Sequence, residues 1–286
     1  EEYKSKYPYP QKGDILISAS GSIGRTVEFA GNNEYFQDSN IVWLNHDERL
    51  SNPFLKCFYS VVKWAGIEGS TIKRLYNDNI LNTVICMPSV PEQKRIGLFF
   101  ENLDNLITLH QRKFEKLTNV KKSMLEKMFP QNGSSYPEIR FKGFTDPWEQ
   151  RKFEEIAVRS SVICSDDTLP RVEYEDIVSG AGRLNKDIYA KQSSKSGIAF
   201  HRGDVLYGKL RPYLQNWLLP TFDGLAVGDF WVLQPQNADS SFLYRLIQSR
   251  QFDEVANQST GTKMPRADWK LVSKTVFSIP SNISEQ

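Results

Sequence analysis

The sequence predicts an α+β protein in which two similar mixed α+β domains are joined by a long coiled-coil helix. Three observations predict this fold. Segments in the first and last parts of the chain repeat one another. Residues 92–129 between them have helical spacing, with one glycine and no proline. In the outer segments, short strand-like runs alternate with glycine and proline, as in domains built from many short strands.

The internal repeat consists of four pairs of similar segments that occur in the same order. Their offset grows only from 190 residues, between Gly13 and Gly203, to 193 residues, between Gln93 and Gln286. A slow drift of this kind is what loop insertions produce in a duplicated domain. The pairs are residues 12–16 with 202–206, 70–74 with 260–266, 84–88 with 276–280, and 91–93 with 284–286.

The segment between the copies predicts one continuous helix over residues 92–129, about 55 Å long. Apolar side chains recur at intervals of three and four residues, which is the spacing of a coiled-coil seam that packs on another helix. Residues 94–130 contain eight Lys or Arg and four Asp or Glu, so this segment carries a net charge of +4. The predicted interface residues of the seam are Ile96, Phe100, Leu103, Ile107, Phe114, Leu117 and Met124.

Each outer segment is expected to hold a mixed α+β core. Strands are predicted at residues 205–207, 217–219 and 230–233, and helices at 53–65, 148–158 and 241–257. The turn-rich residues 130–137 predict a linker before the second domain.

Composition limits the classes of protein that need to be considered. A net charge of +2 over 286 residues excludes a histone-like polycation, although a near-neutral chain can still gather cations on one face. Three scattered cysteines indicate neither a disulfide scaffold nor a zinc site, and they fit a reducing cytoplasm. No apolar run approaches the roughly 20 residues of a membrane helix. We therefore expect a cytoplasmic protein without membrane contact, metal or cofactor.

Several blocks of the central segment closely resemble a known family. Residues 92–97 (EQKRIG), 110–113 (HQRK), 128–130 (MFP), 137–144 (PEIRFKGF) and 148–150 (WEQ) are similar to the central conserved region of type I restriction–modification specificity (S) subunits. The Gly-Asp-Ile/Val-Leu signature and the closing Glu-Gln of each copy are similar to that family's target-recognition domains. The resemblance extends over essentially the whole chain.

The resemblance implies a division of labour along the chain. Residues 1–91 would be the C-terminal part of a first DNA target-recognition domain, 92–145 the central spacer helix and linker, 146–280 a second recognition domain, and 281–286 the start of a second spacer. Against the family pattern, about 44 residues of the first domain and the second spacer helix are absent, as judged from the repeat. We therefore expect a fragment that self-associates through its spacer helix.

The implied function is non-catalytic recognition of a bipartite target in double-stranded DNA. In this family each recognition domain reads one half of the target, and the S subunit binds methyltransferase (M) subunits, which bring in restriction (R) subunits. The length of the spacer would then set the gap between the half-sites, because two similar domains can meet major-groove segments about one helical turn apart. Two other classes stay open: the recognition part of a DNA methyltransferase whose catalytic motifs lie outside this segment, and a structural rod with two adhesive domains.

Candidate DNA-binding residues lie in loops that follow the repeated strands. The Gly-rich segment 18–25 is either a plain hairpin or a loop that lets Ser20, Ser22 and Arg25 approach DNA phosphates. A strand-like run at 207–213 would place Lys209 and Arg211 on one face.

In this run Tyr213 flanks the two cations, which are either solvated surface residues or contacts to phosphate and base edges. A hydroxyl-rich loop in each copy is either a surface turn or a phosphate clamp; its candidate cations are Lys73 and Arg74 in the first copy and Lys263 and Arg266 in the second.

Overall fold

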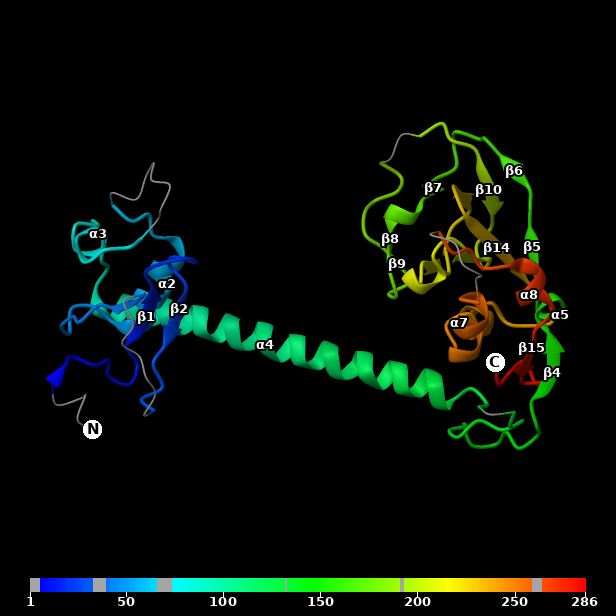
Figure 1. Cartoon of the computed structure of the whole chain (residues 1–286), viewed down its shortest axis with the longest axis horizontal. Coiled ribbons are helices and arrows are strands. Elements are labelled where there is room, and N and C mark those ends of the chain that lie inside the picture. Colours follow the sequence, from blue (N-terminus) through cyan, green and yellow to red (C-terminus); the bar gives the residue numbers. More distant parts are fainter. Residues whose placement is uncertain (1–5, 33–39, 66–73, 132, 191–192, 259–263) are drawn as a thin grey trace. The chain divides into compact units, whose positions relative to one another are not determined.

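The computed structural model describes residues 6–32, 40–65, 74–131, 133–190, 193–258 and 264–286. The chain forms two compact units, Glu1–Lys116 and Leu117–Gln286. The long helix α4 (Val90–Lys127) belongs to both units, since its first part packs in one and its last part in the other (Figure 1). The observed fold is therefore the expected mixture of small sheets, short helices and one long helix.

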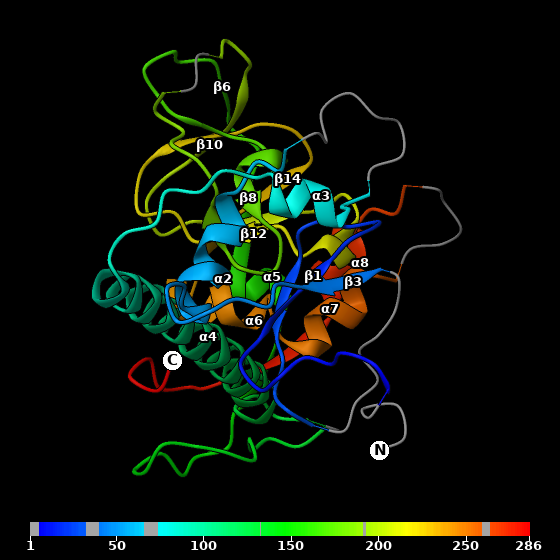
Figure 2. The same cartoon turned by 90° about the vertical axis from the view of Figure 1, so that its left-hand side faces the viewer.

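The first unit is built on a three-stranded antiparallel sheet in the order β2-β1-β3. Its strands are β1 (Ile15–Ser18), β2 (Thr26–Glu28) and β3 (Ile41–Trp43). Two helices follow the sheet, α2 (Asn52–Val61) and α3 (Asn77–Leu81). Figure 2 shows α2 between the sheet and the start of α4. The core fills with side chains from β1 and α2, among them Ile17, Phe54 and Leu55.

The second unit contains two four-stranded sheets, in the orders β6-β10-β13-β7 and β12-β11-β14-β5, and two small ribbons, β15-β4 and β8-β9. Its core is rich in aromatic rings: Tyr207 stacks on Trp231, and Phe153 contacts both Phe252 and Phe277. The strands are β4 (Glu149–Lys152), β5 (Ala157–Ser160), β6 (Ile163–Cys164), β7 (Arg171–Val172), β8 (Ile177–Val178), β9 (Arg183–Leu184), β10 (Gly197–Phe200), β11 (Val205–Gly208), β12 (Trp217–Leu218), β13 (Gly224–Ala226), β14 (Phe230–Pro235) and β15 (Val276–Ile279). The helices are α5 (Phe153–Ile156), α6 (Ser240–Leu246), α7 (Arg250–Ala256) and α8 (Trp269–Lys274), with 3-10 turns at Tyr174–Asp176 and Pro212–Leu214.

The repeat found in the sequence is also a repeat in the structure. Strand β1 lies between β2 and β3 as β11 lies between β12 and β14, and all four pairings are antiparallel. The turn before each first strand is also the same, since Gly13 and Gly203 have φ angles of 94° and 92°. A side chain at either glycine would be strained in this left-handed conformation, which explains why both copies keep glycine there.

Helix α4 is continuous from Val90 to Lys127, so the prediction of one uninterrupted helix over this segment is confirmed within two residues at each end. Gly97 explains how its first turns pack: a Cβ placed on Gly97 would lie 2.3 Å from the Cβ of Pro53, at the start of α2. The only glycine of this helix is therefore the point of closest contact with α2. Ile96, predicted as an interface residue of the seam, packs against the core of the first unit.

Two predicted helices of the second unit were wrong in extent. Residues 148–158 form strand β4, the short helix α5 and strand β5, because β15 and β14 offer open edges with which β4 and β5 pair. The single helix predicted over 241–257 is two helices, α6 and α7, since the Ser249 hydroxyl accepts a hydrogen bond from the Phe252 amide and begins a new helix. The helix predicted at 53–65 is α2, which ends earlier, at Val61.

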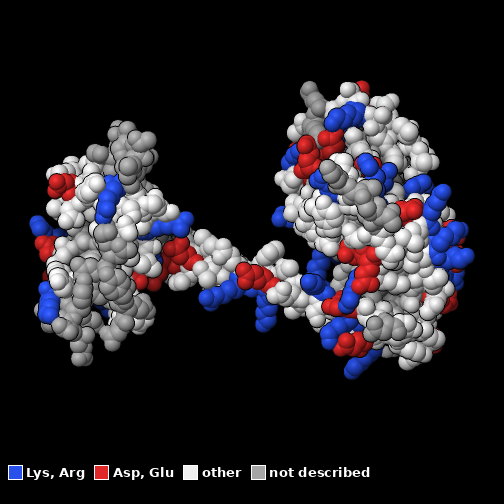
Figure 3. Space-filling model, viewed as in Figure 1, with Lys and Arg blue, Asp and Glu red and all other residues white. Residues whose placement is uncertain are grey.

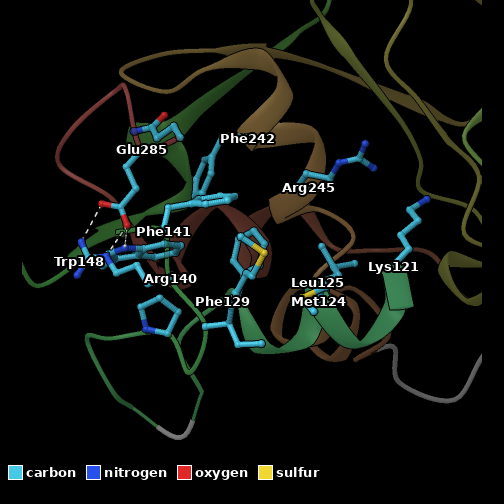
Figure 4. Close-up of a pocket in the computed structure, with 14 residues that line it drawn as sticks. Lys121, Met124, Leu125, Phe129, Arg140, Phe141, Trp148, Phe242, Arg245 and Glu285 are labelled. Atoms are coloured by element: carbon cyan, nitrogen blue, oxygen red, sulfur yellow. Dashed lines mark hydrogen bonds and ion pairs between the residues drawn. The ribbon is translucent and has the colours of Figure 1, made fainter. Parts of the chain in front are cut away.

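The linker and the last residues of the chain close over the end of α4 within the second unit. Arg140 donates from Nε and Nη2 to the two carboxylate oxygens of Glu285, at 2.7 and 2.8 Å, and Trp148 Nε1 donates to the same carboxylate at 2.9 Å. These groups border a mostly apolar pocket of about 360 Å³, which Met124 and Phe129 also line (Figure 4).

Candidate nucleic-acid interface

Three charged side chains meet in the second unit where the loop before β14 passes the end of β11. Lys209 Nζ lies 3.4 Å from Asp229 Oδ1, and Arg266 Nη2 lies 3.1 Å from Asp229 Oδ2. The carboxylate thus bridges two cations that come from segments 57 residues apart in the chain, and the cluster keeps a net charge of +1. All three side chains are partly exposed, from 29% for Asp229 to 52% for Arg266, so solvent reaches the cluster.

Backbone hydrogen bonds fix the segments that carry this cluster. Leu210 forms an isolated antiparallel bridge with Arg266, and the Ala267 amide donates to the Lys209 carbonyl at 2.8 Å. The Tyr174 hydroxyl donates to the Asp229 carbonyl at 2.6 Å and accepts from the Leu210 amide at 3.0 Å. Burial raises the pKa of Tyr174, so this hydroxyl stays protonated and able to donate.

The first unit has the same crossing of segments at the equivalent place. Ser20 forms an isolated antiparallel bridge with Arg74, and the Leu75 amide donates to the Ala19 carbonyl at 2.8 Å. The Ala19 amide donates to the Asn40 carbonyl at 2.7 Å, as the Lys209 amide does to Asp229. The side chains differ: the Ser20 hydroxyl lies 2.5 Å from Asn40 Oδ1, and the Arg74 guanidinium lies 5.8 Å from the centre of the Tyr76 ring.

The structure therefore places four of the sequence-predicted DNA-binding residues at two equivalent backbone crossings, in which Arg74 corresponds to Arg266 while Lys209 corresponds to Ala19. Ser20 and Arg74 meet in one unit, and Lys209 and Arg266 meet in the other. Lys73 and Lys263, the remaining predicted residues of these loops, lie outside the described residues.

The predicted extended run over 207–213 was wrong. Strand β11 ends at Gly208, and Tyr207 is buried in the aromatic core rather than beside the cations. Arg211 has φ 49° and ψ 65°, in the left-handed region, and begins the 3-10 turn Pro212–Leu214. Lys209 and Arg211 consequently do not share one strand face. Arg211 and Tyr213 are nevertheless exposed on the surface of this turn.

The Gly-rich segment 18–25 is a hairpin that joins β1 to β2, as one of the two sequence interpretations held. The Ser18 hydroxyl donates to the Ser22 carbonyl, and the Ser18 amide donates to the Arg25 carbonyl at 2.9 Å. The side chains of Ser22 and Arg25 are exposed on this hairpin.

Sequence reasoning missed Asp229 and Asn40, the residues that lie beside the cations and hydroxyls of each cluster. Both immediately precede a strand, β14 in one unit and β3 in the other, at an offset of 189 residues. Extending the repeat to this third strand would have found the pair. No such signal pointed to Tyr174, which reaches the cluster from outside the duplicated strands.

The surface around the clusters is mixed in charge. On the face shown in Figure 3, Lys and Arg side chains are interspersed with Asp and Glu over the second unit rather than gathered in one field. A mixed surface of this kind suits local contacts to single phosphates better than a broad electrostatic attraction. Among the helices of the described chain, none is both long and apolar enough to cross a membrane.

The chain thus contains two copies of one unit, and each copy has polar and cationic side chains where two segments cross. Comparison with known proteins shows what this chain is similar to. Residues 1–119 match the family model described as the type I restriction modification DNA specificity domain. Over these residues the chain is similar to the DNA specificity domain of type I restriction–modification systems.

Individual relatives extend this similarity along the chain. The putative type I restriction enzyme specificity subunit S.HindORF215P of Haemophilus influenzae is 58% identical over 112 residues, which is 38% of this chain and 29% of the relative. The type I restriction enzyme EcoDI specificity subunit of Escherichia coli is 22% identical over 243 residues, 74% of this chain and 54% of the relative. The chain therefore spans less than two thirds of these curated relatives.

Solved structures share the fold. The S subunit of a type I restriction–modification system from M. genitalium aligns with a TM-score of 0.51 and 17% identity, over 96% of this chain and 74% of that one. A chain from a study of complex assembly and conformational transition in a type I restriction–modification system aligns with a TM-score of 0.50 and 14% identity, over 94% and 70%.

Proposed function

We propose that this chain is the DNA-specificity component of a type I restriction–modification system. Each of its two units binds one half of a bipartite target in double-stranded DNA, and the chain itself catalyses no reaction. The observation that carries the proposal is the repeated strand crossing, which pairs Ser20 with Arg74 in one unit and Leu210 with Arg266, beside Lys209, in the other. A duplicated unit with an equivalent cation in each copy suits a ligand that is itself repetitive in charge, as the DNA backbone is.

The proposal divides the binding energy between two kinds of contact. Cations and hydroxyls of the clusters position the duplex through its phosphates, while a few side chains in each unit select base edges. We extend the proposal to methyltransferase subunits and, through them, restriction subunits as partners in the cytoplasm, as the sequence resemblance to S subunits implies. In this assignment helix α4 is the coiled-coil spacer between two target-recognition domains.

Salt-dependent DNA binding tests this function. The chain should bind random duplex DNA with an affinity that falls linearly on a log–log plot as salt rises, because phosphate contacts release counterions. Selection from a random duplex library should then enrich two separate short motifs at a constant spacing. Absence of duplex binding even at 50 mM salt, with the chain folded by circular dichroism, would contradict the proposal.

A further inference from the structure

The two units differ in two side chains at this crossing, because the positions of Lys209 and Asp229 in the second unit are Ala19 and Asn40 in the first. Position 229 is an aspartate that contacts Lys209 and Arg266, whereas position 40 is an asparagine whose Oδ1 accepts from the Ser20 hydroxyl. The backbone around both positions is the same: each carbonyl accepts the amide of the residue that follows β1 or β11, at 2.7 Å for Asn40 and 2.9 Å for Asp229. On a shared backbone, the second unit therefore has a cation and a carboxylate where the first unit has neither.

We propose that Asp229 is a specificity-determining residue that restrains non-specific DNA binding by the second unit. This inference rests on the proposed function. It gives the carboxylate a role in discrimination between DNA sequences, in addition to the binding that the cations provide. The carboxylate neutralises one of the two cations, so that an approaching phosphate meets a local charge of +1 instead of +2. It also holds both cations through separate oxygens, which sets their directions before DNA arrives.

Two features make the restraint effective. Asp229 is held by its backbone, since the Tyr174 hydroxyl donates to the Asp229 carbonyl and the Lys209 amide donates to the same atom. The carboxylate is also 29% exposed, so it is close enough to solvent to repel a phosphate that arrives out of register. A phosphate in register meets Lys209 and Arg266 first, whereas a displaced one faces the carboxylate. The penalty thus falls mainly on misaligned, non-specific complexes.

The substitution Asp229→Asn tests the inference, because it gives position 229 the residue that the chain itself has at position 40. Binding of random duplex DNA should become about tenfold tighter at 0.1 M salt, and the log–log salt slope should steepen by about 0.9, since one more phosphate is neutralised. Binding of a duplex that the wild-type chain selects from a random library should tighten less, so that discrimination falls. In a selection with the variant, base preference should relax in one half-site and stay unchanged in the other.

Two further variants make the result specific to this position. The reciprocal substitution Asn40→Asp should make the salt slope shallower by about 0.9, because it adds a carboxylate to the first unit's cluster. Asp187→Asn removes the same charge from an exposed loop of the second unit, where the carboxylate accepts a hydrogen bond from the Tyr189 amide, and should change slope and discrimination little.

The outcomes separate this inference from the function on which it rests. If the wild-type chain binds no duplex DNA, both are wrong. If it binds DNA with the expected salt dependence but Asp229→Asn leaves slope and discrimination unchanged, only the role of Asp229 is wrong. An equal gain in affinity for selected and random duplexes would also overturn the specificity role, because it would show a general charge effect.

Discussion

Equivalent residues of the two units make the same contacts although they stand in different local sequences. Asp14 accepts from the Gln11 amide at 2.7 Å, and Asp204 accepts from the His201 amide at 2.9 Å. The closing glutamine of each copy, Gln93 or Gln286, accepts from the amide of the residue that caps an earlier helix of its unit, α2 or α6, and donates to a proline carbonyl. These polar contacts recur in both copies of the duplicated unit.

Removing two candidate phosphate contacts together tests the interface of the second unit at the residue scale. Lys209→Ala with Arg211→Ala should weaken duplex binding and lower the log–log salt slope by about 2, because each lost phosphate contact removes roughly 0.9. The measurement is the affinity for one random duplex between 50 and 200 mM salt. Lys142→Ala with Lys152→Ala, both exposed in the same unit, removes the same charge elsewhere and should leave the slope nearly unchanged. Equal slopes for wild type and the Lys209/Arg211 variant would place this turn away from DNA.

Glu285 makes the stability of the second unit depend on pH. Burial by itself raises the pKa of this carboxyl, but hydrogen bonds from Arg140 and Trp148 outweigh burial and hold the pKa below its usual value. A carboxylate with a lowered pKa stabilises the fold above the unfolded pKa, about 4.3, and this contribution is lost as pH falls through the folded pKa. Glu285→Gln should therefore lower the free energy of unfolding at pH 7 by about 1–3 kcal/mol.

The difference between wild type and Glu285→Gln should shrink as pH falls below about 4. Urea unfolding followed by tryptophan fluorescence measures it at pH 7 and pH 3. Glu138→Gln is the matched control, because Glu138 pairs with Lys127 on the surface, where an ion pair contributes at most about 1 kcal/mol. A Glu285→Gln effect that is the same at both pH values would show that the charge of Glu285 contributes nothing.

Secondary-structure elements differ in how far the sequence could predict them. Helix α4 was predictable because its periodicity extends over ten turns without a breaker, and local spacing alone determines it. Strand β4 was not, because Glu149–Lys152 is a polar segment that becomes a strand only by pairing with β15, more than a hundred residues away. The cluster cations were found from the repeat, whereas the left-handed turn at Arg211 has no local signal such as glycine or asparagine.

The packing of α4 on α2 gives a prediction at the scale of elements. Gly97→Ala would gain about 1 kcal/mol of helix propensity if the position were open. Because the new Cβ would lie 2.3 Å from Pro53 Cβ and 2.9 Å from the Pro53 carbonyl carbon, the two helices must instead separate. We expect the free energy of unfolding to fall by about 1–3 kcal/mol, as in overpacked cores.

A substitution on the exposed side of the same helix serves as the control. Asn105→Ala adds helix propensity at an exposed position and should leave stability unchanged or slightly higher. Thermal unfolding of both variants by circular dichroism measures the difference. Equal or greater stability of Gly97→Ala would mean that α2 can move away from α4 without loss of packing.

At the scale of the whole molecule, the face of α4 that the sequence marks as a seam is open to solvent. Phe100, Leu103, Ile107, Phe114 and Leu117 are 38% to 70% exposed. Charge along the helix is uneven: residues 98–111 carry only the acids Glu101 and Asp104, whereas residues 112–127 carry six Lys or Arg and two Glu. An antiparallel partner would place the acidic part of one helix opposite the basic part of the other.

We therefore expect two copies of the chain to associate through antiparallel α4 helices. The five seam side chains, each about half exposed, would contribute on the order of 4–8 kcal/mol per chain on burial. Burial in both chains doubles this free-energy gain, whereas association itself costs about 4–15 kcal/mol. We therefore expect an equilibrium between one chain and two that depends on concentration. Light scattering of the purified chain over a hundredfold range of concentration should show a mass that rises from one chain toward two.

Charged substitutions on opposite faces of α4 assign the association to the seam. Ile107→Glu with Phe114→Glu should keep the chain monomeric at concentrations where the wild type pairs, because two carboxylates on each chain would lose water in the interface. Asn105→Glu with Asn119→Glu adds the same charge on the opposite side of the helix and should leave the pairing intact, since the helical period turns these positions about half a circle away from the seam. A wild-type mass of one chain at every concentration, with the helix still formed by circular dichroism, would show that the exposed seam does not drive self-association. Loss of pairing in both variants would place the contact outside the seam.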